Sequence, residues 1–250
     1  MSVSTTATVP GGEEQKISAL GRVTGVLFSP KETFADIVRK PTVLVPILIM
    51  TVLGLGVAYM MNQRIDWYAY IRQQIEMSPR AANMSADQIN QAARMQSGFS
   101  PPFAYVIGLL GGVVFPLIMG LVYWGSFNLL AGLNVRFKQA WSIATHASMT
   151  SLISSPVLIL VLFLKERGEV DPETMLVSSA AGFLGEGAPR WLASVASSFE
   201  LFWFWTLFLL AVGFAAINPR KLTTGKALGI LIGVWLVWVM LKAGLAAAFS

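Results

Sequence analysis

Five long apolar blocks, separated by polar stretches, dominate the pattern of the chain. They occupy approximately residues 42–61, 103–131, 140–164, 201–217 and 227–249. A transmembrane helix needs about 20 mostly apolar residues. Blocks of this kind are too long for strands and show no alternation with a period of two. The pattern therefore predicts an all-α, polytopic membrane protein with five transmembrane helices.

A short charged helix with a defined start directly precedes the first block. In "FSPKETFADIVRKP", Ser29 is the expected N-cap, Pro30 suits the first helical position, and Glu32 lies where it would complete a capping box. A proline ends this helix just before the bilayer. We expect residues 13–41 to form a cytoplasmic amphipathic segment that follows a disordered tail at 1–12.

The two faces of this helix differ in their chemistry. Phe34 and Ile37 share one face at helical spacing, whereas Lys31, Arg39 and Lys40 occupy the rest. A helix of this kind would rest in the headgroup layer with its cations near anionic lipid. An alternative that fits the same pattern is a structural collar, in which the helix packs onto the ends of the spans.

The polar stretch between the first two blocks, residues 62–102, predicts a pair of external helices. Ser78 and Pro79 break its first helical pattern, and "SADQ", which begins at Ser85, is a capping box that starts a second helix. We expect this pair to end at "GFSPP" and to form a lid over the bundle, with a partner-binding element as the alternative. Residues 165–200 would form the second external loop.

Composition supports the membrane assignment and limits the chemistry. Apolar residues make up 55% of the chain and charged residues only 12%, against about 25% charged residues in soluble domains. The chain has no cysteine and one histidine, which argues against a metal site built by the protein. It also lacks the H-E-x-x-H, G-x-S-x-G and P-loop motifs. We therefore expect no cofactor, no metal and no enzymatic activity.

The distribution of basic residues predicts the orientation of the chain. Its formal net charge is +5, and two short connections carry cations without any acid, one with Arg136 and Lys138 and the other with Arg220 and Lys221. Both connections fall on the same side as the N-terminus, whereas the longer loops on the other side mix acids with bases. Basic residues in short loops mark the cytoplasmic side. We expect a cytoplasmic N-terminus and an external C-terminus.

The candidate binding surface combines the N-terminal helix with these two basic turns. Its residues are Lys31, Phe34, Ile37, Arg39, Lys40, Arg136, Lys138, Arg220 and Lys221. The partners expected for such a surface are membrane lipids, in particular anionic lipids at the cytoplasmic face. A protein partner or a second copy of the chain is an alternative, and nucleic acid is not expected.

Four polar residues within or near the apolar blocks suggest an alternative function. Polar groups are costly in a bilayer unless they are paired or hydrated. Asn128 and His146 are expected at similar depths on neighbouring spans, and Glu200 and Lys242 at similar depths near the outer face. These residues could line the path of a small transporter or channel. The structural alternative is a helix-packing hydrogen bond for the first pair and an ion pair for the second.

Two sets of glycines in the blocks repeat every four residues. One set is Gly108 and Gly112, and the other is Gly225, Gly229 and Gly233. This spacing permits close approach between membrane helices.

The order of these features resembles the bacterial branch of the Yip family, the Ypt/Rab-interacting membrane proteins. The resemblance covers almost everything after about residue 20 and rests on "FSPKETF" with "KP", on "NVRFKQAWSIATHASM" and on "FELFWFWTLFLLAVGFAAINPRKLTTGKALGILIGVWLVW". It implies five spans, a cytoplasmic N-terminus and a location in the bacterial inner membrane. Eukaryotic relatives bind prenylated small GTPases, but their tyrosine-glycine-proline motif is not found in this chain.

Together these observations predict a non-enzymatic scaffold or membrane-organising factor that acts through lipid or protein partners at the cytoplasmic face. The alternative is a small transporter or channel for an ion or small solute. The two hypotheses use different residues, because the first needs the basic surface and the second needs the intramembrane polar groups.

Overall fold

The computed structural model describes residues 17–170, 172, 178–184 and 188–248, so the tail predicted to be disordered at 1–12 lies outside the described residues. This part of the chain is helical, contains no strand, and has a single isolated β-bridge between Ser179 and Glu200. Four stretches of helix are long and apolar enough to cross a membrane. The all-α, multi-pass architecture is therefore as predicted.

The helices follow one another in a simple order along the chain. The α-helices are α1 (Ala19–Phe28), α2 (Pro30–Arg39), α3 (Leu44–Arg64), α4 (Trp67–Glu76), α5 (Ala86–Leu130), α6 (Phe137–Ala147), α7 (Ser151–Leu164), α8 (Arg190–Ala196), α9 (Leu201–Ala215) and α10 (Thr224–Ala248). Short 3-10 turns are η1 (Pro79–Asn83), η2 (Ser148–Thr150) and η3 (Ala180–Phe183). Because η2 joins α6 directly to α7, these three elements form one span of 28 residues.

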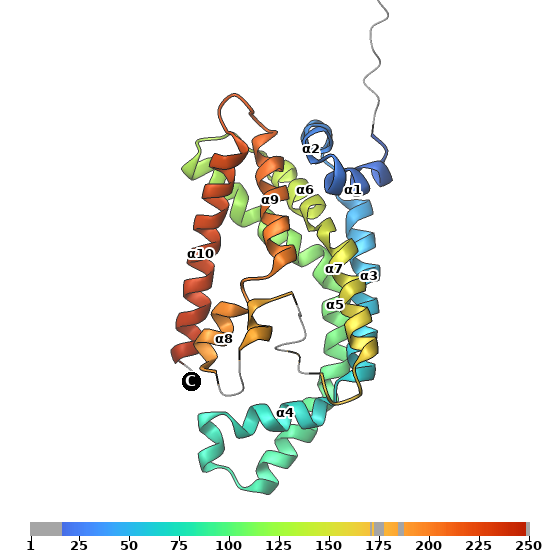
Figure 1. Ribbon diagram of the computed structural model, residues 1–250, viewed down its shortest axis with the longest axis vertical. Coiled ribbons are helices and arrows are strands. Elements are labelled where there is room, and N and C mark those ends of the chain that lie inside the picture. The colour runs from blue at the N-terminus through green and yellow to red at the C-terminus, as the bar shows by residue number, and fades with distance from the viewer. Residues whose placement is uncertain (1–16, 171, 173–177, 185–187, 249–250) are drawn as a thin grey trace, which may run out of the picture.

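The long helices run alternately up and down the molecule (Figure 1). Helices α1 and α2, the connection from α5 to α6 and the loop from α9 to α10 all lie at one end, which we call the basic end. Helix α4 and the start of α5 lie at the opposite end. The grouping of the two short basic connections with the N-terminal helices is thus a property of the fold.

Helix α5 is one continuous element, which corrects the expected boundary of the external helical pair. Its capping box forms as predicted, with the Ser85 hydroxyl accepting from the Gln88 amide at 3.3 Å. The helix then continues through "GFSPP" and into the second span without a break, over 45 residues. It packs against α3 and α4, and the side-chain amide of Asn62 donates to the Pro101 carbonyl at 3.2 Å. Tertiary contacts here outweigh the helix-breaking tendency of two adjacent prolines.

Glycines allow α3 and α5 to lie in close contact. A Cβ atom at Gly54 would come within 2.5 Å of the Gly108 carbonyl oxygen, and a Cβ atom at Gly112 within 3.1 Å of the Thr51 amide nitrogen. The first distance leaves no room for a side chain, and the second is tighter than an ordinary van der Waals contact. The glycine spacing at 108 and 112 therefore serves helix contact, as membrane helix packing predicts.

The block at 201–217 departs from the prediction of five full-length spans. It forms α9, which has 15 residues and is about 22 Å long at 1.5 Å per residue, against a hydrocarbon core of about 30 Å. Its second half is almost wholly buried by neighbouring helices. The helix starts at Glu200 because that carboxylate caps it, so the apolar run is not extended toward the opposite end.

The expected second external loop, 165–200, does not lie wholly beyond the bundle. Its last part forms α8, which packs against α10 (Figure 1). The Lys242 ammonium donates to the Ser197 hydroxyl at 2.8 Å. This segment therefore fills space beside α10 that the short helix α9 leaves uncovered.

Most of the hydrophobic core lies toward the basic end. Buried side chains from α1, α2, α5, α6, α9 and α10 form one cluster there, with Phe127 stacked on Phe214 at 4.1 Å between ring centroids. A much smaller cluster of Ile65, Leu162 and Val170 lies near the opposite end. The tightly packed half is thus the half that carries the N-terminal helices.

Candidate functional site

Helices α1 and α2 form a compact pair at the basic end, which we call the collar. Val23 and Val26 of α1 and Phe34 and Ile37 of α2 are buried in the main core. Helix α2 packs on α6 and α9, and a Cβ atom at Gly213 would meet the Phe34 ring at 3.0 Å. Phe34 and Ile37 therefore contact protein, which corrects their prediction as lipid- or partner-binding residues and favours the collar alternative.

The start of α2 also differs in detail from its prediction. Ser29 is at the N-cap position and Pro30 follows it, but the Ser29 side chain makes no capping hydrogen bond, so the expected capping box is not formed. Ser29 is at the same time the C-cap of α1, and its amide donates to the Gly25 carbonyl at 2.7 Å. Because one residue ends α1 and begins α2, its backbone conformation serves the turn between them.

A buried ion pair joins the two helices of the collar. The Arg22 guanidinium contacts the Asp36 carboxylate through Nε and Nη2, both at 2.8 Å, and the two side chains are only 8% and 12% exposed. Arg22 also donates to the Lys40 carbonyl at 2.8 Å and to the Thr42 hydroxyl at 2.9 Å. The arginine thus fixes the angle between α1, α2 and the start of the first span.

Helix α6 completes this network from the other side. The Ser142 hydroxyl donates to the Thr42 carbonyl at 2.7 Å and accepts from the Thr42 amide at 3.2 Å. The Gln139 side chain donates to the Val38 carbonyl at 3.1 Å. Helix ends leave backbone groups unpaired, and these bonds pair the backbone groups of Val38 and Thr42 where the chain leaves the collar and enters α3.

The cations of the collar lie on its outer surface. Lys31, Arg39 and Lys40 are exposed, on the side of α2 away from the core. Exposed cations also occupy the two short connections at the same end of the molecule, namely Arg136, Lys138, Arg220 and Lys221. The fold therefore brings the seven predicted cationic residues to one end, although Phe34 and Ile37 are not part of the surface.

The predicted contact between Asn128 and His146 is wrong. Asn128 instead closes the turn after α5, because its side chain donates to the Val135 carbonyl at 3.2 Å and accepts from the Val135 amide at 2.8 Å. His146 is buried, and its Nδ1 lies 2.9 Å from the Ser142 carbonyl oxygen within the same helix. Both residues have local partners, so neither pairs across the bundle.

The predicted ion pair between Glu200 and Lys242 is also wrong. The Glu200 carboxylate caps α9, accepting from the amides of Phe202 and Trp203 at 3.0 and 2.6 Å, and the Ser178 hydroxyl donates to it at 2.6 Å. Lys242 bonds instead to the hydroxyls that end α8. A carboxylate at a helix N-terminus is stabilised by the free amides and the dipole there, so Glu200 has no need of a cation.

A cavity of about 700 Å³ lies between α3, α5, α7 and α9. It is mainly apolar, and its hydroxyl groups come largely from Ser148, Thr150, Ser151, Ser154 and Ser155. Of the four residues proposed for a transport path, Glu200 lines it, whereas Asn128, His146 and Lys242 do not. The structure therefore does not gather those four residues along one path.

Arg22, Asp36, Gln139 and Ser142 are central to this site and were not predicted from the sequence. A signal was present, because Asp36 stands next to the apolar positions of α2 and Arg22 next to those of α1. A charge on an apolar helical face usually has a buried partner.

Comparison with known proteins agrees with this architecture. The model of the Yip1 domain family matches residues 24–245. The chain is 27% identical to the membrane protein YknW of Bacillus subtilis (strain 168) over 222 residues, which cover 88% of this chain and 89% of that protein. No solved structure matches the chain. Since the family model covers the second half of α1, every helix from α2 to α9 and most of α10, this multi-pass membrane protein belongs to the Yip1 domain family.

Proposed function

We propose that this protein is a non-enzymatic membrane scaffold that presents a fixed basic surface to anionic lipids or a protein partner at the cytoplasmic face. The observation that carries the proposal is the attachment of the collar. The Arg22–Asp36 pair and the bonds to α6 hold α2 rigidly, while Lys31 and Lys40 remain exposed. A recognition surface held in one geometry loses little conformational entropy when it binds.

Two exposed apolar side chains support contact between the collar and the bilayer. Leu20 is 68% exposed and Phe28 is 79% exposed, both on α1. They lie on the helix that crosses the end of α3 (Figure 1). Apolar side chains combined with nearby cations are the pattern of an interfacial helix. The membrane-contacting role expected of Phe34 and Ile37 would thus belong to residues of α1.

The proposal includes five crossings with the N-terminus in the cytoplasm. Four stretches are long and apolar enough to span by themselves, and α8 together with α9 returns the chain from the end of α7 to the start of α10 (Figure 1). The fifth crossing would therefore be a broken one. The two short basic connections support a cytoplasmic assignment of the basic end, which in a bacterial cell faces inward from the inner membrane.

The test compares the full chain with a collar variant that carries Lys31→Glu, Arg39→Glu and Lys40→Glu. Protein is extracted from native membranes into polymer-bounded nanodiscs, and its lipids and copurifying proteins are measured. Each surface cation contributes roughly 1 kcal/mol to attraction by an anionic membrane. We expect the variant to lose its enrichment in anionic lipid and its partners.

The control carries Lys165→Glu and Arg167→Glu, two exposed cations that follow α7 at the opposite end. It should behave as the wild type. Unchanged lipids and partners in the collar variant would refute the proposal. So would solute flux in proteoliposomes that disappears in the His146→Ala variant, because that result would make the protein a transporter.

A further inference from the structure

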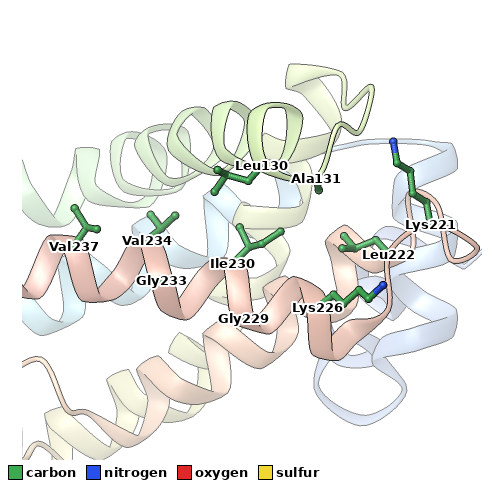
Figure 2. A pocket seen from close by; sticks show the side chains of 10 residues that line it. All are labelled: Leu130, Ala131, Lys221, Leu222, Lys226, Gly229, Ile230, Gly233, Val234 and Val237. Carbon is green, nitrogen blue, oxygen red and sulfur yellow. The ribbon is translucent and has the colours of Figure 1, made fainter.

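A groove of about 660 Å³ opens on the outside of the bundle, between the end of α5 and the first half of α10. Leu130 forms one wall, and Gly229, Gly233 and Val237 lie along the other (Figure 2). Lys221 and Lys226 lie at one end of the groove, on opposite sides of Leu222, and Val237 lies toward the other end (Figure 2). The groove is therefore cationic at the basic end and apolar along its length.

The glycines that line this groove have no helix packed against them. A Cβ atom at Gly229 or Gly233 would find nothing within 4 Å, in contrast to Gly108, where it would meet the backbone of α3. Helix α10 packs mainly on α8 and α9. The small residues therefore leave free space at the surface that faces the bilayer.

The charge at the end of the groove is not neutralised by the protein. The Lys221 ammonium donates to the Gly132 carbonyl at 2.6 Å, which leaves two of its three N–H groups available. The Lys226 ammonium is exposed and has no hydrogen-bonding or ionic partner among the described residues. No acid occurs in 131–139 or 216–230, the two segments that surround this end. An anion would complement the site.

We propose that this groove binds one anionic phospholipid. Its phosphate would lie between Lys221 and Lys226, near the positive N-terminal end of α10, and one acyl chain would run past Gly229 and Gly233. From Lys226 to Val237 the helix rises about 16 Å at 1.5 Å per residue. This length matches one leaflet, which is roughly half of the 30 Å hydrocarbon core.

A second copy of the chain fits the groove less well than a lipid does. Two copies in one membrane have the same orientation, so a symmetric contact would bring equivalent residues together at equal depth. Lys226 of one copy would then lie near Lys226 of the other, with no acid to separate them. The like charges would repel each other, whereas a phosphate attracts both lysines.

The experiment uses the purified, delipidated full chain in mild detergent, titrated with phosphatidylglycerol or with phosphatidylcholine. Native mass spectrometry counts the lipids that remain bound. We expect one phosphatidylglycerol to be retained per protomer, with phosphatidylcholine retained at least about tenfold less. Lys221→Gln with Lys226→Gln should weaken phosphatidylglycerol binding about tenfold or more, since each cation contributes to the attraction.

A second variant tests the apolar part of the site. Gly229→Leu with Gly233→Leu fills the groove, and it should fold because each new side chain enters open space. We expect it also to lose the bound lipid, whereas Gly244→Leu, on the same helix but outside the groove, should keep it. Equal binding of the two lipids, or binding that survives groove filling, would overturn the inference. A dimer that forms without lipid and is lost on groove filling would overturn it in favour of a second copy.

This inference deepens the proposed function and depends on it only in assigning the lysines to the cytoplasmic leaflet. The two can fail separately, because the collar variant and the groove variants change different residues. Loss of bound lipid in the groove variants together with a silent collar variant would support the lipid site and reject the scaffold proposal. The reverse result would support the scaffold and reject the lipid site.

Discussion

Arg22 and Asp36 show how strongly single residues hold the collar. Both side chains are nearly buried, and the arginine also satisfies two oxygen atoms where the chain passes from α2 to α3. Removing one partner from such a pair leaves a charge buried without compensation. The cost of that change is therefore larger than the net contribution of the intact pair.

We predict that Asp36→Asn lowers the free energy of unfolding by about 3 to 5 kcal/mol, because the Arg22 charge loses its partner. Titration of SDS in mixed micelles measures this change. The control is Glu76→Gln, which breaks the exposed pair of Arg72 and Glu76 and should cost only about 0.3 to 0.5 kcal/mol. Equal effects of the two substitutions would show that the buried pair contributes no more to stability than the exposed pair.

A second prediction at this scale concerns Gly213, the position in α9 where the collar docks. A Cβ atom there would come within 2.5 Å of Ile143 and 3.0 Å of Phe34. We expect Gly213→Ala to cost about 1 to 3 kcal/mol through overpacking and to make α2 more accessible to protease. Gly244→Ala, which meets no atom within 4 Å, should show neither effect.

At the scale of elements, close contact between α3 and α5 depends on glycines whose sequence spacing alone does not identify them. Gly108 and Gly111 are three residues apart on α5, yet only Gly108 faces the backbone of α3. The spacing of glycines on α10 looks equally suited to contact and instead borders open space. Spacing predicts that a helix can be approached closely, and the arrangement of neighbours decides whether it is.

We predict that Gly108→Ala destabilises the protein by about 1 to 3 kcal/mol, because its new methyl group would meet the Gly54 carbonyl oxygen at 2.6 Å. Gly111→Ala should instead raise stability by roughly 0.5 to 1 kcal/mol, as alanine is the better helix former. The midpoint of thermal unfolding in detergent distinguishes the two. If Gly108→Ala proves neutral, α3 and α5 are not in close contact.

At the scale of the whole molecule, the fold separates the chain into two ends of different character. Short acid-free connections and the collar lie at the basic end, and helix α4 lies at the opposite end (Figure 1). The main core lies near the first, so the half that carries the cations is also the better packed half. This arrangement agrees with the proposed function, which needs a basic surface of fixed shape.

Single cysteines test this arrangement directly, because the chain has none of its own. We predict that Lys31→Cys and Lys138→Cys react with a membrane-impermeant maleimide only after the cells are permeabilised. Arg167→Cys and Gln91→Cys should react in intact cells. Equal labelling of Lys31→Cys and Lys138→Cys, and of Arg167→Cys and Gln91→Cys, would agree with the fold. Which of the two pairs reacts in intact cells tests the orientation. Reaction of Lys31→Cys and Arg167→Cys from the same side would contradict both.

Composition and short-range pattern are sufficient to predict several features of this protein. Long apolar blocks require helices, because a bilayer offers no partners to backbone groups, and the capping box at Ser85 works through neighbours three residues away. The gathering of basic residues at one end follows from helices that alternate in direction. The collar was predicted as a helix for the same local reasons.

The partners of most polar side chains, in contrast, depend on how the helices pack. Asn128 and Lys242 bond to groups that no sequence spacing identifies, and the burial of Phe34 depends on the space left by Gly213. The length of α5 likewise reflects packing, because its contacts with α3 and α4 outweigh the local preference at its prolines. Sequence pattern assigns a face to each helix, and the neighbouring helices determine whether that face meets protein or lipid.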